Sequence, residues 1–507
     1  GAAQLGFYAQ DEWRVTNDFR LTYGLRLDIP VFFDTPRAND LFNSSSVAST
    51  LGLATDQMPS SKILWSPRVG FRWNLNEDHT TLLRGGAGIF TGRVPFVWLS
   101  NSISKAGIEL SETFLSSKES FDAARADGFK FNADPSKQYY NRNAAIPTAE
   151  INVVDKDFPS VARVNLALEH TFVFGVKATL EGLYSKTLNN ILYENANYQW
   201  TGETLNNGGD NRPIYKKQDN NFTQIMYLKN TSNGYTYNLS AKLEKNFDFG
   251  LSTMVAYTYG QAKSLTDGNS SQAYSGWKYN PTYYGDINPE LTWSSFDVRN
   301  RIIASVSYRK EYAKHFATTV SLFYNGQTGG RYSLLDYSDI NHDGYNNDLL
   351  YVPTDAEFDK MTFTEYTKTV GNDKIVVSPA EQKEAMANWI NGNEELRGSK
   401  GTHMKRYQMV MPFEHHFDFH IAQDFFVDIA GKRNTIQVNF DIINVGNLFN
   451  KSWGLYNQTS TGYDLAPLTT KVADGVATYQ FRDPGEMVKN KDIPSRWHAQ
   501  VGLKYIF

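Results

Sequence analysis

The last twelve residues, RWHAQVGLKYIF, constrain the fold of this chain more than any other segment. Apolar and aromatic side chains alternate there with mostly polar ones. The apolar set is Trp497, Ala499, Val501, Leu503, Tyr505 and Phe507. Because a strand turns successive side chains to opposite faces, the pattern predicts a two-faced strand that ends the chain. At a tilt of about 45°, Trp497 and Phe507 would lie about 23 Å apart along a membrane normal, which matches the roughly 25 Å apolar band that transmembrane strands cross.

The composition agrees with a chain that crosses a membrane with strands. No run of about eighteen apolar residues exists, so the sequence predicts no transmembrane helix. Aromatic residues make up 14% of the chain although its mean hydropathy is −0.48, as expected when half of each strand faces water. The net charge of −4 gives no basic footprint for nucleic acid. Cysteine is absent, which excludes a disulfide scaffold and cysteine-based zinc sites.

The alternating pattern recurs along the whole chain. Residues 19–29 and 65–75 carry apolar side chains at every odd position, and later segments repeat this on both sides of short turns. The pattern predicts about thirteen strands in which short turns alternate with long loops. This arrangement is typical of outer-membrane barrels, with the short turns periplasmic and the long loops extracellular. A soluble β-sandwich, the alternative, predicts shorter strands and loops of similar length at both ends.

We therefore expect an all-β fold, a transmembrane antiparallel β-barrel in the outer membrane with a periplasmic C-terminus. Bacterial single-chain barrels have an even number of strands. Counting back through the hairpins from Phe507, the first strand runs inward from the outside, and an open sheet edge is not tolerated in lipid. Residues 1–507 are therefore expected to be the C-terminal portion of a barrel. Its earlier strands are expected to lie outside this sequence or to come from another chain.

Six segments also share a family pattern. They are GFYAQDEWRVTNDFRLTYGLRLD (6–28), SPRVGFRWNL (66–75), LLRGGAGIFTGRVPFVWLSN (82–101), FDVRNRIIASVSY (296–308), FDIINVGNLFN (440–450) and the terminal strand. In this order they resemble TonB-dependent outer-membrane transporters, specifically the Oar-like branch common in Bacteroidota and myxobacteria. The resemblance implies a 22-strand barrel, an N-terminal plug and energy coupling to inner-membrane TonB. Neither a plug nor a TonB box is present in this sequence, so coupling to TonB would require a missing N-terminal part.

The segment DINHDGYNNDL, residues 339–349, is a candidate calcium loop. Asp339, Asn341, Asp343 and Gly344 follow the D-x-[DN]-x-[DN]-G opening of such loops, in which alternating oxygen side chains converge on one hard cation. The carbonyl of Tyr345 would be the next ligand, with Asn347 or Asp348 completing the shell. The bidentate glutamate of an EF-hand is missing, because residue 350 is leucine. The alternative is an Asp/Asn-rich turn closed by hydrogen bonds from side chains to the backbone.

Other segments suggest a lumen surface and structured loops. Arg68, Arg72 and Arg84 face the predicted lumen, where they would meet plug carboxylates, an anionic substrate or water. Residues 120–129 and 379–397 have helical patterns inside long loops, which suggests a lid, a docking surface or packing against neighbouring loops. We find no nucleophile elbow, phosphate loop or triad, so no enzyme is expected.

The leading functional hypothesis is TonB-coupled uptake of a bulky extracellular ligand. The alternatives are a receptor-like barrel with a structural or protein-export role in an envelope complex, and a passive porin. The expected partners are outer-membrane lipid, TonB, and an extracellular ligand or surface lipoprotein, with no nucleic acid. The aromatic and Asn-rich stretch 193–207 suits sugars or peptides, and the identity of the ligand cannot be inferred from the residues.

Overall fold

A large antiparallel sheet dominates the computed structural model. The structure describes residues 1–59, 61–92, 96–108, 115, 117–137, 150–154, 157–459, 464–473, 476–484 and 488–507. The principal sheet has 16 strands, of which 13 follow one another in a continuous antiparallel path. The other three, β5 (Ile151–Val154), β10 (Ile225–Thr231) and β13 (Thr292–Trp293), attach where the long connections begin. The expectation of about thirteen long strands is therefore confirmed.

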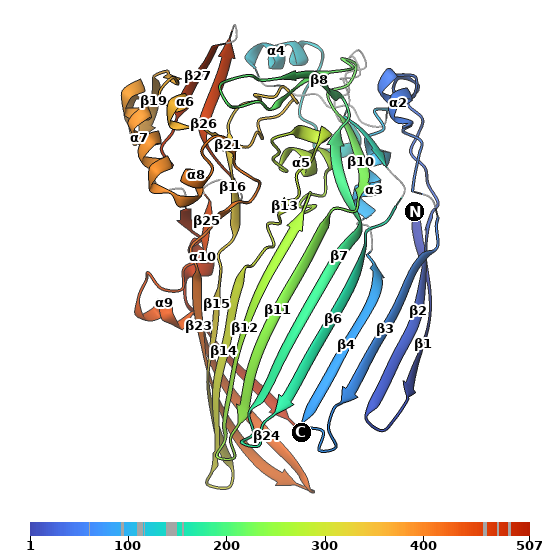
Figure 1. The fold of residues 1–507 in the computed structure, drawn as a ribbon, viewed down its shortest axis with the longest axis vertical. Helices are drawn as coiled ribbons and strands as arrows, with labels where there is room; N and C mark the ends of the chain where they lie inside the picture. The colour runs from blue at the N-terminus through green and yellow to red at the C-terminus, as the bar shows by residue number, and fades with distance from the viewer. Residues whose placement is uncertain are drawn as a thin grey trace.

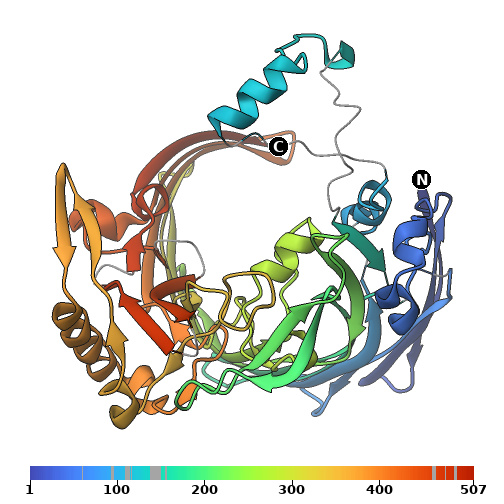
Figure 2. The same ribbon diagram turned by 90° about the horizontal axis from the view of Figure 1, so that it is seen from above.

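The path curves into an arc around a central space, the lumen (Figures 1 and 2). In spatial order its strands are β1 (Ala2–Arg14), β2 (Phe19–Phe32), β3 (Leu64–Asn74), β4 (Thr81–Thr91), β6 (Ser160–Thr171), β7 (Lys177–Asn195), β11 (Gly234–Asn246), β12 (Leu251–Ser264), β14 (Asn300–Tyr312), β15 (Phe316–Gln327), β23 (Glu414–Ile429), β24 (Lys432–Ile443) and β29 (His498–Ile506). Among the described residues, β1 pairs only with β2, and β29 only with β24. The arc is therefore open.

Short and long connections alternate along this path, as the sequence predicts. Successive hairpins close with tight turns at one end, for example at Gly175 and Gly250, where φ is +78° and +97°. Glycine suits these positions because residues with a side chain rarely adopt a positive φ. The long connections gather at the other end in a thick layer, which we call the loop layer, and the C-terminus lies at the short-turn end (Figure 1).

The outward face of the sheet is apolar and exposed, the reverse of a soluble protein. On β29, Val501 and Leu503 are 75% and 77% exposed, and their register partners on β24, Phe440 and Val438, share that face. Polar Thr435 on the opposite face of β24 is only 7% exposed. An apolar face of this extent is stable only against lipid, which supplies the apolar surroundings that a core would supply elsewhere.

The buried apolar residues instead gather in the loop layer. One cluster packs Leu334, Leu350, Met386, Leu396 and Phe481 together, all at most 1% exposed. A second packs Leu228 and Trp277, and a third packs Phe42 against Phe222. These clusters draw residues from several connections, so the layer has its own packed interior.

Short helices and strands complete the loop layer. The helices are α1 (Asp40–Asn43), α2 (Ser46–Leu51), α3 (Phe96–Ser104), α4 (Lys118–Ala126), α5 (Ala273–Lys278), α6 (Asp355–Phe358), α7 (Pro379–Gly392), α8 (Glu394–Gly398), α9 (Val445–Phe449) and α10 (Asp492–Ser495). The strands are β8 (Tyr198–Thr204), β9 (Pro213–Lys217), β16 (Arg331–Asp336), β17 (Tyr351–Val352), β18 (Thr362–Phe363), β19 (Tyr366–Val370), β20 (Asp373–Val377), β21 (Thr402–His403), β22 (Met409–Val410), β25 (Asn457–Thr459), β26 (Asp464–Ala473), β27 (Val476–Phe481) and β28 (Val488–Asn490).

Both predicted loop helices are confirmed. Residues 120–129 overlap α4, and residues 379–397 form α7 and α8. A capping box starts α7: Ser378 Oγ accepts from the Glu381 amide, and the Glu381 carboxylate accepts from the Ser378 amide. In the part of the chain that the structure describes, we find no helix with the length and apolar character needed to cross a membrane.

Candidate functional site

The loop layer encloses a cavity of about 350 Å³ between segments that are far apart in the sequence. Its polar and aromatic lining includes Asn207, Asp210, Arg212, Asp336, Tyr351, Glu357, Lys360, Thr470 and Tyr479. The Tyr351 hydroxyl donates to Glu357 at 3.0 Å, and the Asn207 amide donates to the Tyr479 hydroxyl at 2.7 Å. Aromatic walls with a few oriented hydrogen-bonding groups are typical of a ligand-binding site.

A buried arginine, Arg212, lines this cavity. The Arg212 side chain is fully buried, and its guanidinium donates to Asp210 Oδ2 at 2.7 Å and to the carbonyl of Leu349 at 3.0 Å. It also lies 2.9 Å from Asp348 Oδ1, without the alignment of a hydrogen bond. Burial opposes the charge, but Asp210 and Asp348 favour it and raise the pKa of Arg212. Arg212 thus ties the β7–β11 connection to the β15–β23 connection.

Two other buried arginines link further connections in the same way. Arg331 donates to Asp297 Oδ2 at 2.6 Å, which joins the β15–β23 connection to the β12–β14 connection. Arg406 donates to the carbonyl of Leu265 at 2.6 Å, across the same two connections. These contacts hold the loops in one arrangement, so the cavity is pre-formed.

Burial raises the pKa of two aspartates beside the cavity, Asp336 and Asp348, above the ordinary value. Burial raises the pKa of Asp336 to about 7, against the opposing effect of hydrogen bonds from Thr470 and Ser338. Burial also raises the pKa of Asp348 to about 6, with Arg212 acting in the opposite direction. The stability of the loop layer should therefore depend on pH.

We expect the free energy of unfolding of the loop layer to fall as the pH rises from about 4 to 7 and to stay constant above pH 7. The ordinary pKa of aspartate is 3.8, so in this range the unfolded chain binds fewer protons than the folded one at Asp336. The free energy of unfolding then falls by up to about 1.4 kcal/mol per pH unit for this group. Asp336→Asn, which mimics the neutral acid, should flatten the slope. Amide hydrogen exchange of β16 and β26 measures this slope, once the rates are corrected for the pH dependence of intrinsic exchange.

The control is Asp492→Asn, because Asp492 is an exposed aspartate. This variant should keep the wild-type slope. Equal slopes in wild type and Asp336→Asn would contradict the prediction.

The candidate calcium loop forms a turn closed by its own hydrogen bonds. The Gly344 amide donates to Asp339 Oδ2 at 3.0 Å, the Asp343 amide to Asn341 Oδ1 at 2.9 Å, and the Tyr345 amide to Asp343 Oδ1 at 3.2 Å. Asp348 is engaged instead by Arg212 and by the Ile340 amide. Among the described residues, no group of three or more His, Cys, Asp or Glu side chains is arranged to hold a metal ion. Calcium binding stays a prediction, with Asp339, Asn341, Asp343, the Tyr345 carbonyl, and Asn347 or Asp348 as its predicted ligands.

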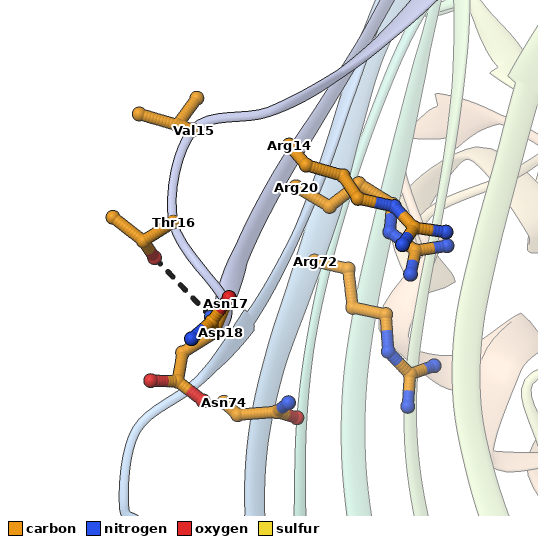
Figure 3. A pocket seen from close by; sticks show the side chains of 8 residues that line it. All are labelled: Arg14, Val15, Thr16, Asn17, Asp18, Arg20, Arg72 and Asn74. Atoms are coloured by element: carbon orange, nitrogen blue, oxygen red, sulfur yellow. Dashed lines mark hydrogen bonds between the residues drawn. The ribbon is translucent and has the colours of Figure 1, made fainter.

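The predicted lumen arginines lie on the concave face, together with two that the sequence analysis did not single out. Arg14, Arg20 and Arg72 project from three neighbouring strands in the same direction, close to the turn at Asn17 (Figure 3). They border a cavity of about 300 Å³. Arg84, on the next strand, donates to Glu169 at 2.8 Å and to Glu181 at 2.9 Å.

The terminal strand β29 lies within the predicted twelve residues but begins two residues after Arg496 and ends one residue before Phe507. Trp497 precedes β29, and its amide lies 3.4 Å from Asn447 Oδ1. Val501, Leu503 and Tyr505 pair in register with Phe440, Val438 and Ile436 and lie on the apolar outward face. Contact of Trp497, Ala499, Val501, Leu503, Tyr505 and Phe507 with lipid remains a prediction.

Sequence reasoning missed the residues that build the loop-layer cavity. Arg212 and Leu349 are 137 positions apart, and Asn207 and Tyr479 are 272 apart. No periodicity links such positions. The only local signal was the Asn-rich stretch 193–207, whose last residue does line the cavity.

The fold and its exposed apolar face define a protein that crosses a membrane with antiparallel strands. The chain belongs to the outer membrane β-barrel domain family, whose model matches residues 2–462. It is therefore an outer-membrane protein.

Solved structures with a similar arrangement are outer-membrane transporters and receptors. The outer membrane transporter YddB from Escherichia coli is 12% identical with a TM-score of 0.44, over 100% of this chain and 45% of that chain. A mutant of the ferric enterobactin receptor PfeA from Pseudomonas aeruginosa is 10% identical with a TM-score of 0.39, over 91% and 41%. The FrpB iron transporter from Neisseria meningitidis is 10% identical with a TM-score of 0.38, over 88% and 41%. The chain thus spans less than half the length of these structures. Curated protein sequences gave no match.

Proposed function

We propose that this chain is the C-terminal part of a TonB-dependent outer-membrane receptor that takes up a bulky extracellular ligand. The observation that carries the proposal is the ordered loop layer over one end of an outer-membrane sheet. Its packed interior and pre-formed cavity suit selective capture, whereas a passive pore needs no such layer. In the usual orientation of these barrels the long loops are extracellular and the C-terminus is periplasmic.

Additional strands are expected to close the barrel. In the described part of the chain, β1 has no partner on the side away from β2, and β29 has none on the side away from β24. Unpaired backbone groups are not tolerated in lipid. We propose that the missing strands and a plug belong to the same receptor, as in the Oar-like branch. If another chain supplies them, the second candidate function, a structural or export role in an envelope complex, is favoured.

Uptake should depend on the proton-motive force. Cells that express the full-length protein, and cells that lack it, would be given a labelled ferric siderophore, a malto-oligosaccharide and an oligopeptide. We expect at least one probe to accumulate about ten times faster with the protein present, and this gain to disappear on addition of a protonophore. Surface binding at low temperature should survive the protonophore. Accumulation that depends on the protein but not on the proton-motive force would refute TonB coupling.

A further inference from the structure

A row of arginines crosses four neighbouring strands on the lumen face. Arg14 lies opposite Arg20, Arg20 opposite Arg72, and Arg72 opposite Arg84. Like charges directly opposite one another destabilise a sheet. The row is therefore costly unless negative charge lies against it.

The barrel wall neutralises only part of this charge. Arg84 is held by Glu169 and Glu181, and Arg20 lies 3.2 Å from Glu12. Within the described ranges, neither Arg14 nor Arg72 has a carboxylate at salt-bridge distance. Asp18 also lines the cavity beside them, but its partner is His79, at 3.7 Å. Two guanidinium groups therefore remain available to an anion.

The space in front of the row is open. One cavity, of about 300 Å³, is bordered by Arg14, Arg20 and Arg72, and Figure 3 shows these three side chains reaching to one side of the strands. A second, of about 320 Å³, is bordered by Arg20, Arg72 and Arg84. Gly70 also lines the second cavity and puts no side chain in the way. The row thus borders space on both sides of Arg20 and Arg72.

We propose that this row binds an acidic polypeptide segment that enters the lumen at the short-turn end. Arg14 and Arg72 are two strands apart, so their Cα atoms are about 10 Å apart. Two acidic residues three positions apart in a polyproline II segment match this separation, because that conformation has three residues per turn, which puts both side chains on one side, and rises about 3.1 Å per residue. Guanidinium groups bind carboxylates through paired, charge-assisted hydrogen bonds.

Site-specific cross-linking in native outer membranes tests this inference. A photoreactive benzoylphenylalanine would replace Asn74, which lines the same cavity, in the full-length protein. We expect a cross-linked segment with at least two Asp or Glu residues within four positions. The yield should fall at least fivefold in Arg14→Gln/Arg72→Gln. Arg14→Lys/Arg72→Lys, which keeps the charge, should retain at least half.

The matched control is Arg301→Gln. Arg301 is an exposed arginine on the same face, is bonded to Asn325, and has no carboxylate partner among the described residues. It should leave the yield unchanged. Heat-modifiable electrophoresis should show that Arg14→Gln/Arg72→Gln folds as well as wild type, since the substitution relieves repulsion. If that variant does not fold, cross-linking of the wild type at 0.5 M instead of 0.05 M NaCl replaces it, and the yield should fall several-fold.

Any of three results would overturn the inference. They are the absence of a cross-link, a cross-linked segment without carboxylates, and a yield that changes neither with the arginine substitutions nor with salt. The inference rests on the lumen face and not on uptake. It can therefore fail while uptake still depends on the proton-motive force, and the reverse is also possible.

Discussion

Arg212→Met should destabilise the loop layer by about 3–5 kcal/mol, because it leaves two buried carboxylates without their counter-charge. Asp348 is 0% exposed and Asp210 is 5% exposed, so water cannot replace the guanidinium. The effect should be confined to the loop layer. We expect hydrogen-exchange protection to fall around residues 205–215 and 336–352, while heat-modifiable electrophoresis still reports a folded barrel.

Two further variants test whether buried charge causes this loss. Replacing all three groups, in Asp210→Asn/Arg212→Met/Asp348→Asn, should recover much of the protection, since no uncompensated charge remains. Arg496→Met removes a comparable arginine–aspartate pair at the surface, where both side chains are about 70% exposed, and should have no measurable effect. A triple variant no better than Arg212→Met would attribute the loss to packing instead.

Val501→Arg should impair barrel folding by about 2–4 kcal/mol, because it places a charge near the centre of a lipid-facing strand. Val501 lies midway along β29, opposite Phe440 and on the apolar outward face. The fraction of the protein that resists unfolding in heat-modifiable electrophoresis of outer membranes should drop sharply. Urea titration of the folded fraction gives the free-energy change.

Gln500→Arg is the matched control for the opposite face. Gln500 is the neighbouring residue and donates to Asp441 at 3.2 Å, so an arginine there gains a counter-charge. The folded fraction should stay near the wild-type value. If both variants fold equally well, the face containing Val501 does not contact lipid.

The strands could be predicted because their signal is local and repeated. In residues 65–75 a side chain at every second position is apolar, and the structure places residues 65–74 in β3. The helix α7 could be predicted for a similar reason, since Ser378, Pro379 and Glu381 form a start signal within four residues. The arginine row was only partly predicted, because strand register and not spacing in the sequence places Arg14 and Arg72 on either side of Arg20.

The amino-acid sequence alone determined the class of fold. Alternation with a period of two requires strands, and an apolar outward face requires lipid. Only the tertiary structure decided how the long connections pack, because their contacts join residues 34 to 141 positions apart and follow no period. Three buried arginines hold that arrangement, because each donates hydrogen bonds to a residue of another connection: Arg212, Arg331 and Arg406. The terminal strand was therefore predictable from twelve residues, whereas the cavity required the whole loop layer.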